Sequence, residues 1–439
     1  MTSQKILIIG GGYVGLYTAL KLQRKLRGEI KRGEIEVTVI APESYMTYQP
    51  FLPEAAAGNL EPRHVVVPLR GVLKRCNILN GRVVQVDHSR HQVEVRLSAK
   101  ESWPVSYDLL VVAVGSISRT LPIAGLAENG IGFKTVEEAI HLRNHVLGRL
   151  DAAASTRDPA ERKRALTFVF VGGGYAGVEA LAELEDMAHD ALRYYPQLTK
   201  ADLRWVLVEA TDKILPEVGP DMGAWTVEAL RKRGIEIRLS TRLESAQKHQ
   251  ISLSDGESFE AETLVWTAGV KPSPMLQNTD LPVDEKGRLK ATAELTVEGL
   301  SDVFTAGDNA AVPDLTKPGE LCAPNAQHAV RQAALLGSNV VATLRGKPLK
   351  PYKHAYVGSV ASLGLHKGVA QVYGVKLRGF PAWFMHRTYH LSRVPTINRK
   401  FRVTADWTLA LFFRRELVSL GALQRPYGEF DLATGRTEE

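Results

Sequence analysis

Two stretches of the chain share one hydrophobic pattern: a short apolar run, a glycine-rich turn and then a helical pattern. The apolar runs are residues 5–9 and 167–171. Apolar runs of this length without alternating polar residues are typical of parallel strands that are buried on both faces. Each run leads into Gly-Gly-Gly-Tyr-x-Gly, and the two copies begin 162 positions apart. The pattern predicts an α/β protein that contains two parallel sheets.

The glycine spacing between strand and helix is the fingerprint of dinucleotide-binding βαβ units. The first glycine permits the tight turn, the second lets a pyrophosphate approach the backbone, and the third lets the helix pack on the strand. The helix N-terminus offers N–H donors to the phosphates. If the motif occurred once, a glycine-rich turn that binds no nucleotide would be an alternative. The presence of two copies makes a nucleotide-free protein a weaker explanation. These roles fall on Gly10, Gly12 and Gly15 in one copy and on Gly172, Gly174 and Gly177 in the other.

The two copies differ in the acidic residue that the fingerprint places after its second strand, for the ribose hydroxyls. Glu209 follows the apolar run 205–208 of the second copy. A carboxylate there accepts a hydrogen bond from the ribose 2′-OH and repels a 2′-phosphate, which favours NADH over NADPH. In the first copy Ala41 and Pro42 follow the run 36–40. Glu43 therefore reaches the ribose from the loop, or the contact is absent.

A third apolar run, residues 303–305, ends in Ala306-Gly307-Asp308. Gly307 permits a close approach of the backbone, and Asp308 can hydrogen-bond a polyol. This tripeptide is weak alone, but two-dinucleotide flavoproteins have the same order of motifs. One glycine loop would then hold a tightly bound flavin and the other a transient nicotinamide.

Composition narrows the class of protein. With 439 residues, 44% hydrophobic and 23% charged, the chain is globular, with two to four domains, and is not disordered, collagen-like or coiled-coil. Two cysteines, Cys76 and Cys322, exclude a disulfide scaffold, a Cys-rich zinc site and a C-x-x-C redox pair, so we expect ordinary buried thiols. No metal site is predicted. The longest run without charge, residues 6–20, is shorter than the ~20 residues of a spanning helix, and no signal peptide is expected.

These motifs together resemble the type II NADH:quinone oxidoreductases of the two-dinucleotide-binding flavoproteins. The resemblance covers most of the chain, and it implies a glutathione-reductase-like architecture of two Rossmann-like domains with FAD on the first and NADH on the second. It implies hydride transfer from NADH to the flavin and two-electron transfer to a membrane quinone, menaquinone or ubiquinone. Besides the glycine loops it rests on Tyr48-Gln49-Pro50, Gly177-Val178-Glu179, Ile214-Leu215-Pro216, residues 265–270, Ala306-Gly307-Asp308 and residues 326–329.

The same resemblance assigns roles to individual residues. Asp308 holds the FAD ribityl chain, and Gly115 closes over the FAD. Ala326 and Gln327 lie against the isoalloxazine near the quinone entry. Ala268 and Gly269 border the NADH cleft. Glu179 lies between flavin and nicotinamide, and its alternative is a first-turn acid that complements a helix dipole.

One departure lies beside this chemistry. The family pattern Ala-Gln-x-Ala-x-Gln ends here in Arg331, and Gln332 follows about 100° away on a helix. A cation at this position favours a quinol anion or an acidic acceptor, or it means that a simple quinone is not the natural acceptor. Two alternatives therefore stay open: an NADH-dependent reductase of another acceptor, and a non-catalytic flavin-binding redox sensor.

Charge is concentrated at the end of the chain. The net charge is +7, while residues 345–439 contain 16 Lys and Arg against 6 Asp and Glu, with aromatic residues among them. This combination suits an anionic membrane surface. The alternative is an interface domain that packs on the core or dimerises. Nucleic acid is not a predicted partner, because no recognition motif is present.

The predicted organisation has three parts. The FAD-binding domain is residues 1–118 and 298–345, the NADH-binding domain is residues 119–297, and residues 346–439 form a membrane-association or interface segment. Alternating apolar positions from 401 to 413 are strand-like, whereas the resemblance indicates membrane-facing helices. We expect a peripheral enzyme on the cytoplasmic face of the cell membrane, with a homodimer as an open alternative.

Overall fold

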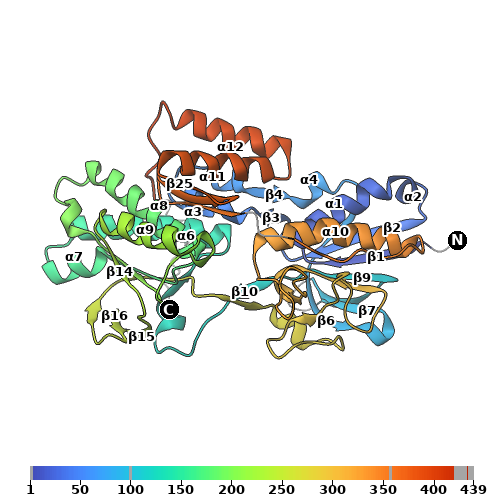
Figure 1. Cartoon of the computed structure of the whole chain (residues 1–439). Helices are drawn as coiled ribbons and strands as arrows, with labels where there is room; N and C mark the ends of the chain where they lie inside the picture. Colours follow the sequence, from blue (N-terminus) through green and yellow to red (C-terminus); the bar gives the residue numbers. More distant parts are fainter. Residues whose placement is uncertain (1–2, 98–100, 355–357, 420–432, 434–439) are drawn as a thin grey trace. The chain divides into compact units, whose positions relative to one another are not determined.

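The computed structural model describes residues 3–97, 101–354, 358–419 and 433 (Figure 1). The chain divides into two compact units, each made of three segments. The first unit is Met1–Thr47, Val66–Ile117 and Val270–Tyr356. The second unit is Tyr48–Val65, Ser118–Gly269 and Val357–Glu439. The end of the predicted C-terminal segment, residues 420–432 and 434–439, lies outside the described residues.

The first unit is built on a five-stranded parallel sheet. Its order is β21 (Val303–Thr305), β9 (Leu109–Val112), β1 (Gln4–Ile9), β2 (Ile35–Ala41) and β5 (Asn77–Asn80). The central strands are apolar on both faces because helices α1 (Tyr13–Lys25) and α10 (Ala326–Leu344) pack side by side on one face (Figure 1). On the other face a core cluster joins β1 and β9 to the antiparallel sheet of β6 (Arg82–Asp87), β7 (Gln92–Arg96) and β8 (Ser102–Ser106).

The second unit repeats the parallel sheet. Its order is β11 (Gly130–Gly132), β18 (Thr263–Trp266), β12 (Thr167–Val171), β13 (Arg204–Val208) and β14 (Ile235–Arg238). In both sheets the strand before a glycine loop is central, with the next Rossmann strand beside it in parallel register. The predicted α/β class with two parallel, Rossmann-like sheets is confirmed. The helices of this unit are α3 (Leu52–Ala56), α5 (Leu126–Asn129), α6 (Val136–Ser155), α7 (Pro159–Ala165), α8 (Tyr175–Ala191), α9 (Pro220–Arg231), α11 (Phe380–Arg393) and α12 (Ile397–Leu409).

Smaller sheets complete both units. Among its described residues, the second unit has two antiparallel sheets of three strands each. One consists of β15 (Leu243–Gln247), β16 (Gln250–Leu253) and β17 (Ser258–Glu260), and the other of β23 (Gly358–Ser362), β24 (Gly368–Val372) and β25 (Val375–Arg378). Short elements of the first unit are α2 (Arg27–Lys31), α4 (Leu69–Val72), β3 (Tyr45–Thr47), β4 (Val66–Pro68), β20 (Leu289–Lys290) and β22 (Ala310–Ala311).

The basic C-terminal segment folds as strands followed by helices. Helix α11 packs on β23 and β24 and buries Trp383, His386 and Arg387. The strand-like alternation that begins at residue 401 is wrong for α12, which starts with a Thr396 cap that accepts a hydrogen bond from the Arg399 N–H. Among the described residues, no helix combines the length and the apolar character needed to cross a membrane.

Candidate functional site

The first glycine loop has the three properties that a dinucleotide requires. Gly10 has φ +108°, and a Cβ there would lie 2.2 Å from the Ala113 carbonyl oxygen. A Cβ on Gly15 would lie 1.9 Å from the Gly10 carbonyl oxygen, so this glycine lets α1 sit directly on the loop. A Cβ on Gly12 would meet nothing within 4 Å. Gly12 caps α1 without any side-chain hydrogen bond, and no acid occupies the first turn, so the helix N-terminus is suited to an anion.

The second loop repeats this geometry residue by residue. Gly172 has φ +115°, and a Cβ there would lie 2.7 Å from the Thr267 hydroxyl. A Cβ on Gly177 would lie 2.0 Å from the Gly172 carbonyl oxygen, whereas a Cβ on Gly174 would meet nothing. Gly174 begins α8, again without a side-chain cap or a first-turn acid. Both loops therefore present a bare helix N-terminus beside a glycine whose Cβ position is open, which fits a pyrophosphate.

The two loops differ at the position where the fingerprint expects an acidic residue. The N–H of Gly10 donates to the Ile40 carbonyl and that of Gly172 to the Val208 carbonyl, so Ala41 and Glu209 occupy equivalent positions. The Glu209 carboxylate accepts the Gly173 N–H at 2.6 Å and, from Thr211, both the N–H and the hydroxyl at 2.8 Å. It is held at the carboxyl end of β13, where a ribose acceptor belongs.

The first loop offers no equivalent acceptor. Ala41 is buried, and Glu43 is exposed in the bend between β2 and β3. Position 41 lies close against the loop, because a Cβ on Gly11 would lie only 2.9 Å from the Ala41 Cβ. A small side chain such as alanine therefore leaves room for the loop. The predicted role of Glu43 at the ribose stays a prediction.

Asp308 lies in a hydrogen-bonded group at the carboxyl end of the first sheet. Its carboxylate accepts the Ser116 hydroxyl at 2.7 Å, and the Gly115 N–H donates to the Asn309 side chain at 3.0 Å. Gly307 has φ +76°, and its N–H donates to the Gln332 side-chain oxygen at 2.8 Å. The structure thus brings Gly115, Gly307 and Asp308 together at this end of the sheet, and their roles at FAD stay predictions.

Gln332 is a residue that sequence reasoning set aside. It is buried on α10 and supports the Gly307 turn, so the position one step beyond the family glutamine serves the backbone of the first unit. The sequence marks Gln332 as a possible buried hydrogen-bonding residue only because a glutamine stands among the apolar positions of a helix.

Helix α10 presents the predicted acceptor-side residues. Asn325 caps it by accepting the His328 N–H at 2.9 Å, so Ala326 and Gln327 occupy the first turn. The half-buried Arg331 guanidinium donates to the Gln327 carbonyl at 3.0 Å. Burial lowers the pKa of His328, opposed by Asp314 and assisted by Arg331. His328 Nδ1 lies 2.9 Å from the Tyr352 hydroxyl.

Glu179 faces the interior of the second unit. Its carboxylate accepts the Ser362 N–H at 2.7 Å and lies 3.2 Å from His386 Nε2. Helix α8 has no acidic residue in its first turn, so the helix-dipole alternative for Glu179 is wrong. The buried partner His386 comes from α11, about two hundred positions away, and was not predicted.

The Tyr48-Gln49-Pro50 segment adds further buried titratable groups. The Tyr48 hydroxyl donates to the His390 carbonyl at 3.2 Å and lies 3.2 Å from His390 Nδ1. The rings of His390 and His386 lie 4.5 Å apart. Burial, with a smaller effect of His386, places the pKa of His390 well below its usual value. Glu179, His386, His390 and Tyr48 therefore lie next to one another in the core of the second unit.

Two further glutamates lie in the same core. The Glu54 carboxylate accepts from the Arg387 guanidinium at 2.7 Å and from the Trp407 indole at 2.8 Å. Among the described residues, Glu183 accepts hydrogen bonds from two neutral groups, the Ser362 hydroxyl at 2.7 Å and the Asn59 amide at 3.1 Å. Burial, together with the Glu54 and Asp186 charges, raises the pKa of Glu183 to about 7.

Ala268 and Gly269 follow β18 and lie against the second glycine loop. A Cβ on Gly172 would lie 2.9 Å from the Ala268 nitrogen. Gly269 has φ +90° with open space at its Cβ position, and its carbonyl accepts the Arg119 N–H at 3.1 Å. Both residues therefore border the predicted NADH loop.

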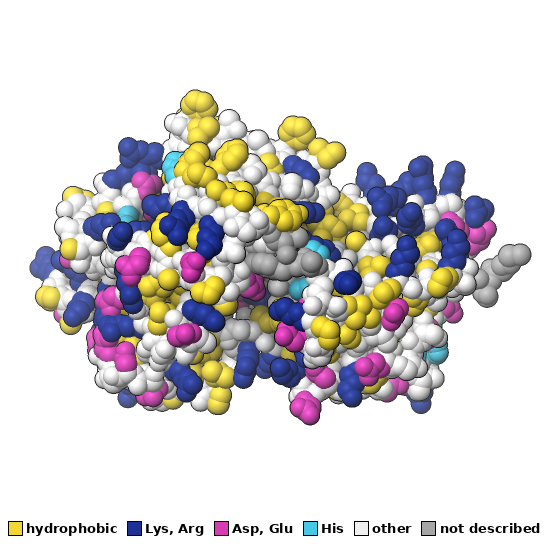
Figure 2. Space-filling view, viewed as in Figure 1, with side chains coloured by type: hydrophobic (Ala, Val, Ile, Leu, Met, Phe, Trp, Pro, Cys, Tyr) yellow, Lys and Arg dark blue, Asp and Glu magenta, His cyan; other side chains and the backbone are white. Residues whose placement is uncertain are grey.

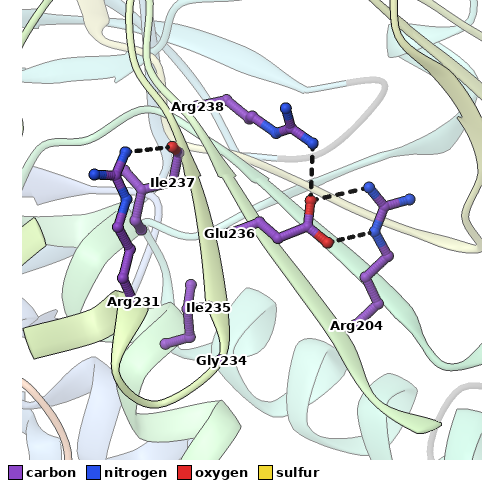
Figure 3. Close-up of a pocket in the computed structure, with 7 residues that line it drawn as sticks. All are labelled: Arg204, Arg231, Gly234, Ile235, Glu236, Ile237 and Arg238. Carbon is purple, nitrogen blue, oxygen red and sulfur yellow. Dashed lines mark hydrogen bonds and ion pairs between the residues drawn. The ribbon is translucent and has the colours of Figure 1, made fainter. Parts of the chain in front are cut away.

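A pocket of about 580 Å³ lies along the edge strand β14 (Figure 3). Figure 3 shows the side chains of Arg204 and Arg238 converging on Glu236. Arg204 also pairs with Glu257 at 2.8 Å. Since these guanidinium groups are neutralised by carboxylates, Arg204 is a poor phosphate clamp. The pocket contains no residue of either glycine loop.

Neither cysteine is suited to redox chemistry. Cys76 and Cys322 are both free. Burial raises the pKa of Cys76 to about 12 and that of Cys322 to about 11. Both stay thiols near neutral pH, whereas a disulfide reductase needs a reactive thiolate.

Comparison with known proteins agrees with this geometry. The pyridine nucleotide-disulphide oxidoreductase family matches residues 4–333. A type II NADH:quinone oxidoreductase of Staphylococcus saprophyticus is 30% identical over 389 residues, which cover 88% of this chain and 93% of that protein. One from Mycobacterium tuberculosis is 28% identical over 94% of this chain and 89% of that protein. The NDH2 structure of Plasmodium falciparum in complex with NADH has a TM-score of 0.86 at 20% identity, covering 95% of this chain and 100% of that one.

Proposed function

The chain belongs to the type II NADH:quinone oxidoreductases, within the pyridine nucleotide-disulphide oxidoreductase family, and from this we propose how its residues carry out that reaction. The observation that carries the proposal is the pair of matching glycine loops of which only the second has an acidic ribose acceptor, Glu209. A loop without the acid suits a cofactor held by many other contacts, and a loop with it suits exchangeable NADH.

FAD and NADH fit the loops, because Gly12 and Gly174 leave open space in front of uncapped helix N-termini. When bound, FAD supplies the redox chemistry, accepting hydride from NADH and giving two electrons to quinone. Gly10, Gly12 and Gly15 hold the FAD pyrophosphate, and Gly172, Gly174 and Gly177 hold that of NADH. Gly115, Gly307 and Asp308 bind the ribityl side of FAD, while Ala268 and Gly269 border the nicotinamide.

The acceptor side is assigned to α10. Ala326 and Gln327 contact the flavin ring, and Arg331 places a positive charge one turn further along the helix. A cation 4 Å from a quinone oxygen would stabilise the negative charge gained on reduction by about 1 to 4 kcal/mol. Glu179, whose carboxylate lies 3.2 Å from His386 Nε2, orients the nicotinamide side.

The proposed membrane contact is an apolar surface on the second unit. Hydrophobic side chains gather at the top of Figure 2, over α11 and α12. This C-terminal apolar surface consists of residues that are 55% to 78% exposed: Phe380, Phe384, Ile397, Phe401, Leu409, Leu411, Phe412 and Phe413. Arg393, Arg402 and Arg414 are exposed among them. Such a surface suits peripheral binding to anionic lipid, where quinone is dissolved.

The proposal also includes the cytoplasmic face of the cell membrane, which the free thiols Cys76 and Cys322 support because they suit a reducing compartment. A homodimer that covers the C-terminal apolar surface is the alternative use of that surface. Sedimentation with and without anionic vesicles separates the two, since a dimer forms without lipid.

The test is an anaerobic spectral titration of the purified holoprotein. NADH should bleach the flavin band rapidly, and a soluble menaquinone analogue should restore it. Bleaching without recovery would show that the flavin passes its electrons to an acceptor other than quinone. Absence of bleaching would contradict the NADH site.

Two matched variants sharpen this titration. Gly12 and Gly174 have φ −74°, which valine accepts, and a new Cβ meets nothing at either position. Gly174→Val should therefore fold and keep FAD but lose reduction by NADH, whereas Gly12→Val should lose FAD. Equal behaviour of the two variants would contradict the assignment of the loops.

A further inference from the structure

Three side chains with metal-binding atoms meet in the first unit. His88 lies in the short turn between β6 and β7, and His91 follows that turn in the left-handed region with φ +50°. Asp302 immediately precedes β21, and its carbonyl accepts the Leu110 N–H of β9 at 2.9 Å. The group thus lies at the amino ends of β9 and β21. The glycine loop lies at the opposite, carboxyl end of this parallel sheet, so the group is separate from the dinucleotide site.

The spacing of the three side chains suits a shared ion better than hydrogen bonds. The Asp302 oxygens lie 3.7 Å from His88 Nε2 and 3.6 Å from His91 Nδ1, longer than the 2.7–3.2 Å of N–H···O bonds. One ligand atom from each residue lies within 4.8 Å of the others. Ligands about 2.0–2.2 Å from a tetrahedral Zn²⁺ are separated by roughly 3.4 Å. The imidazole rings are 5.0 Å apart and tilted by 41°, so both can address one ion.

The surroundings hold the histidine turn in place. His88 Nδ1 lies 3.1 Å from the Tyr107 hydroxyl, which leaves Nε2 directed to the Asp302 side. The backbone N–H groups of His88 and Ser89 donate to the Asp280 carboxylate at 2.8 and 3.0 Å. A partner on the second ring nitrogen is the usual way in which proteins orient a metal-binding histidine.

The local charge also suits a cation. Among the described residues, His88 and His91 are the only ion-pair partners of Asp302. The Asp280 carboxylate lies beside the same turn, whereas that of Asp87 is paired with Arg90 at 3.5 Å. No lysine or arginine of the described chain therefore competes for the Asp302 oxygens.

We propose that His88, His91 and Asp302 bind one divalent transition-metal ion of the zinc class, with water completing the coordination. Two imidazoles and one carboxylate are borderline ligands that suit Zn²⁺ or Co²⁺ better than Ca²⁺ or Mg²⁺. The ion ties the β6–β7 turn to β21, the strand that leads into Gly307 and Asp308. It stabilises the first unit and takes no part in the redox reaction. This proposal stands apart from the proposed function, because it uses none of the same residues.

Isothermal titration of the full-length, tag-free holoprotein with ZnCl₂ and CoCl₂, after chelator treatment and dialysis, tests the site. Wild type should bind one ion per chain, and Zn²⁺ should raise the melting temperature. His91→Ala and Asp302→Asn should each weaken binding by more than the 10- to 100-fold that loss of a ligand's hydrogen-bond partner costs, and should abolish the shift in melting temperature.

His249→Ala is the matched control, since His249 is an exposed histidine at the β15–β16 turn of the second unit. Flavin content and circular dichroism establish that each variant is folded. A wild-type protein that binds neither ion would overturn the proposal. Undiminished binding by the folded Asp302→Asn and His91→Ala proteins would also overturn it, because the ion would then lie elsewhere.

Discussion

The buried carboxyl of Glu183 makes the stability of the second unit depend on pH. Burial and the nearby Glu54 and Asp186 charges raise the pKa of Glu183 from 4.5 to about 7, against a smaller effect of the Ser362 hydrogen bond. Arg387 forms an ion pair with Glu54, whereas the hydrogen-bond partners of Glu183 in the described part of the chain are neutral. Glu183 is therefore protonated in the folded protein at slightly acidic pH.

The sign of the effect follows from linkage. Between pH 4.5 and about 7 the folded state binds a proton that the unfolded state has released, so stability falls as pH rises through this window. Below 4.5 both states are protonated, and above the folded pKa both are ionised, so no further change comes from Glu183. A shift of about 2.5 units at 1.36 kcal/mol per unit corresponds to about 3 kcal/mol.

Glu183→Gln removes this dependence, because glutamine mimics the protonated acid. It keeps the acceptor for Ser362, and the Asn59 amide can turn over to present its oxygen to the new NH₂ group. Relative to wild type, the variant should gain about 3 kcal/mol of unfolding free energy between pH 4.5 and about pH 8.

The assay is urea unfolding at several pH values, followed by tryptophan fluorescence. Five of the six tryptophans belong to the second unit, so the signal reports on that unit. Glu244→Gln, at an exposed position on β15, is the control and should parallel wild type. A constant difference between Glu183→Gln and wild type across the pH range would refute the reasoning.

Three further predictions concern the cofactor, the membrane and the core. Glu209→Gln keeps an acceptor for the loop but removes the charge, so the kcat/KM preference for NADH over NADPH should fall about tenfold or more; an unchanged ratio would exclude Glu209 as the ribose ligand. Phe401→Glu should weaken binding to anionic vesicles by about tenfold in flotation, whereas Tyr194→Glu, exposed outside that surface, should not; equal flotation would contradict the membrane contact. Arg387→Met leaves the buried Glu54 unpaired and should cost about 3–5 kcal/mol in urea unfolding, and a loss below about 1 kcal/mol would show that the pair is dispensable.

Helix α11 contributes side chains both to the C-terminal apolar surface and to the core. A point substitution therefore tests the membrane contact more cleanly than a truncation. Phe380 and Phe384 are exposed, but Trp383, His386 and Arg387 on the same helix are buried against the core. Deleting the chain from Phe380 would therefore remove the partners of Glu54 and Glu179 together with the apolar surface. Such a truncation would confuse loss of lipid binding with loss of folding.

Several buried partners were beyond sequence reasoning. The contacts of Glu179 with His386, of Glu54 with Arg387 and of Asp302 with His88 each join residues that are far apart in the chain. No local pattern marks such pairs, because a lone histidine or glutamate in an apolar stretch has the same appearance whether or not the fold supplies a partner. For this reason the sequence alone does not indicate that His88, His91 and Asp302 lie together.

Features that depend on neighbouring residues alone can be predicted from the chain. A β-branched run, a glycine that accepts positive φ, a glycine without room for a Cβ and a helix start are all encoded within about twenty residues. Gly10 and Gly172 adopt the expected backbone, and Glu209 is held where its place after the strand predicts. The duplicated loops are therefore sufficient to predict the fold class.

The tertiary structure decided what alternation and charge left open. Residues 401–409 belong to helix α12 despite their strand-like alternation, because Thr396 caps the helix, Val403 is buried, and Trp407 donates to Glu54. The same packing decides which aromatic side chains are buried and which form the C-terminal apolar surface. Secondary-structure propensity depends on neighbours along the chain, whereas burial depends on segments that folding brings together. Only this tertiary packing determines which of these residues lie in the core and which lie on the surface.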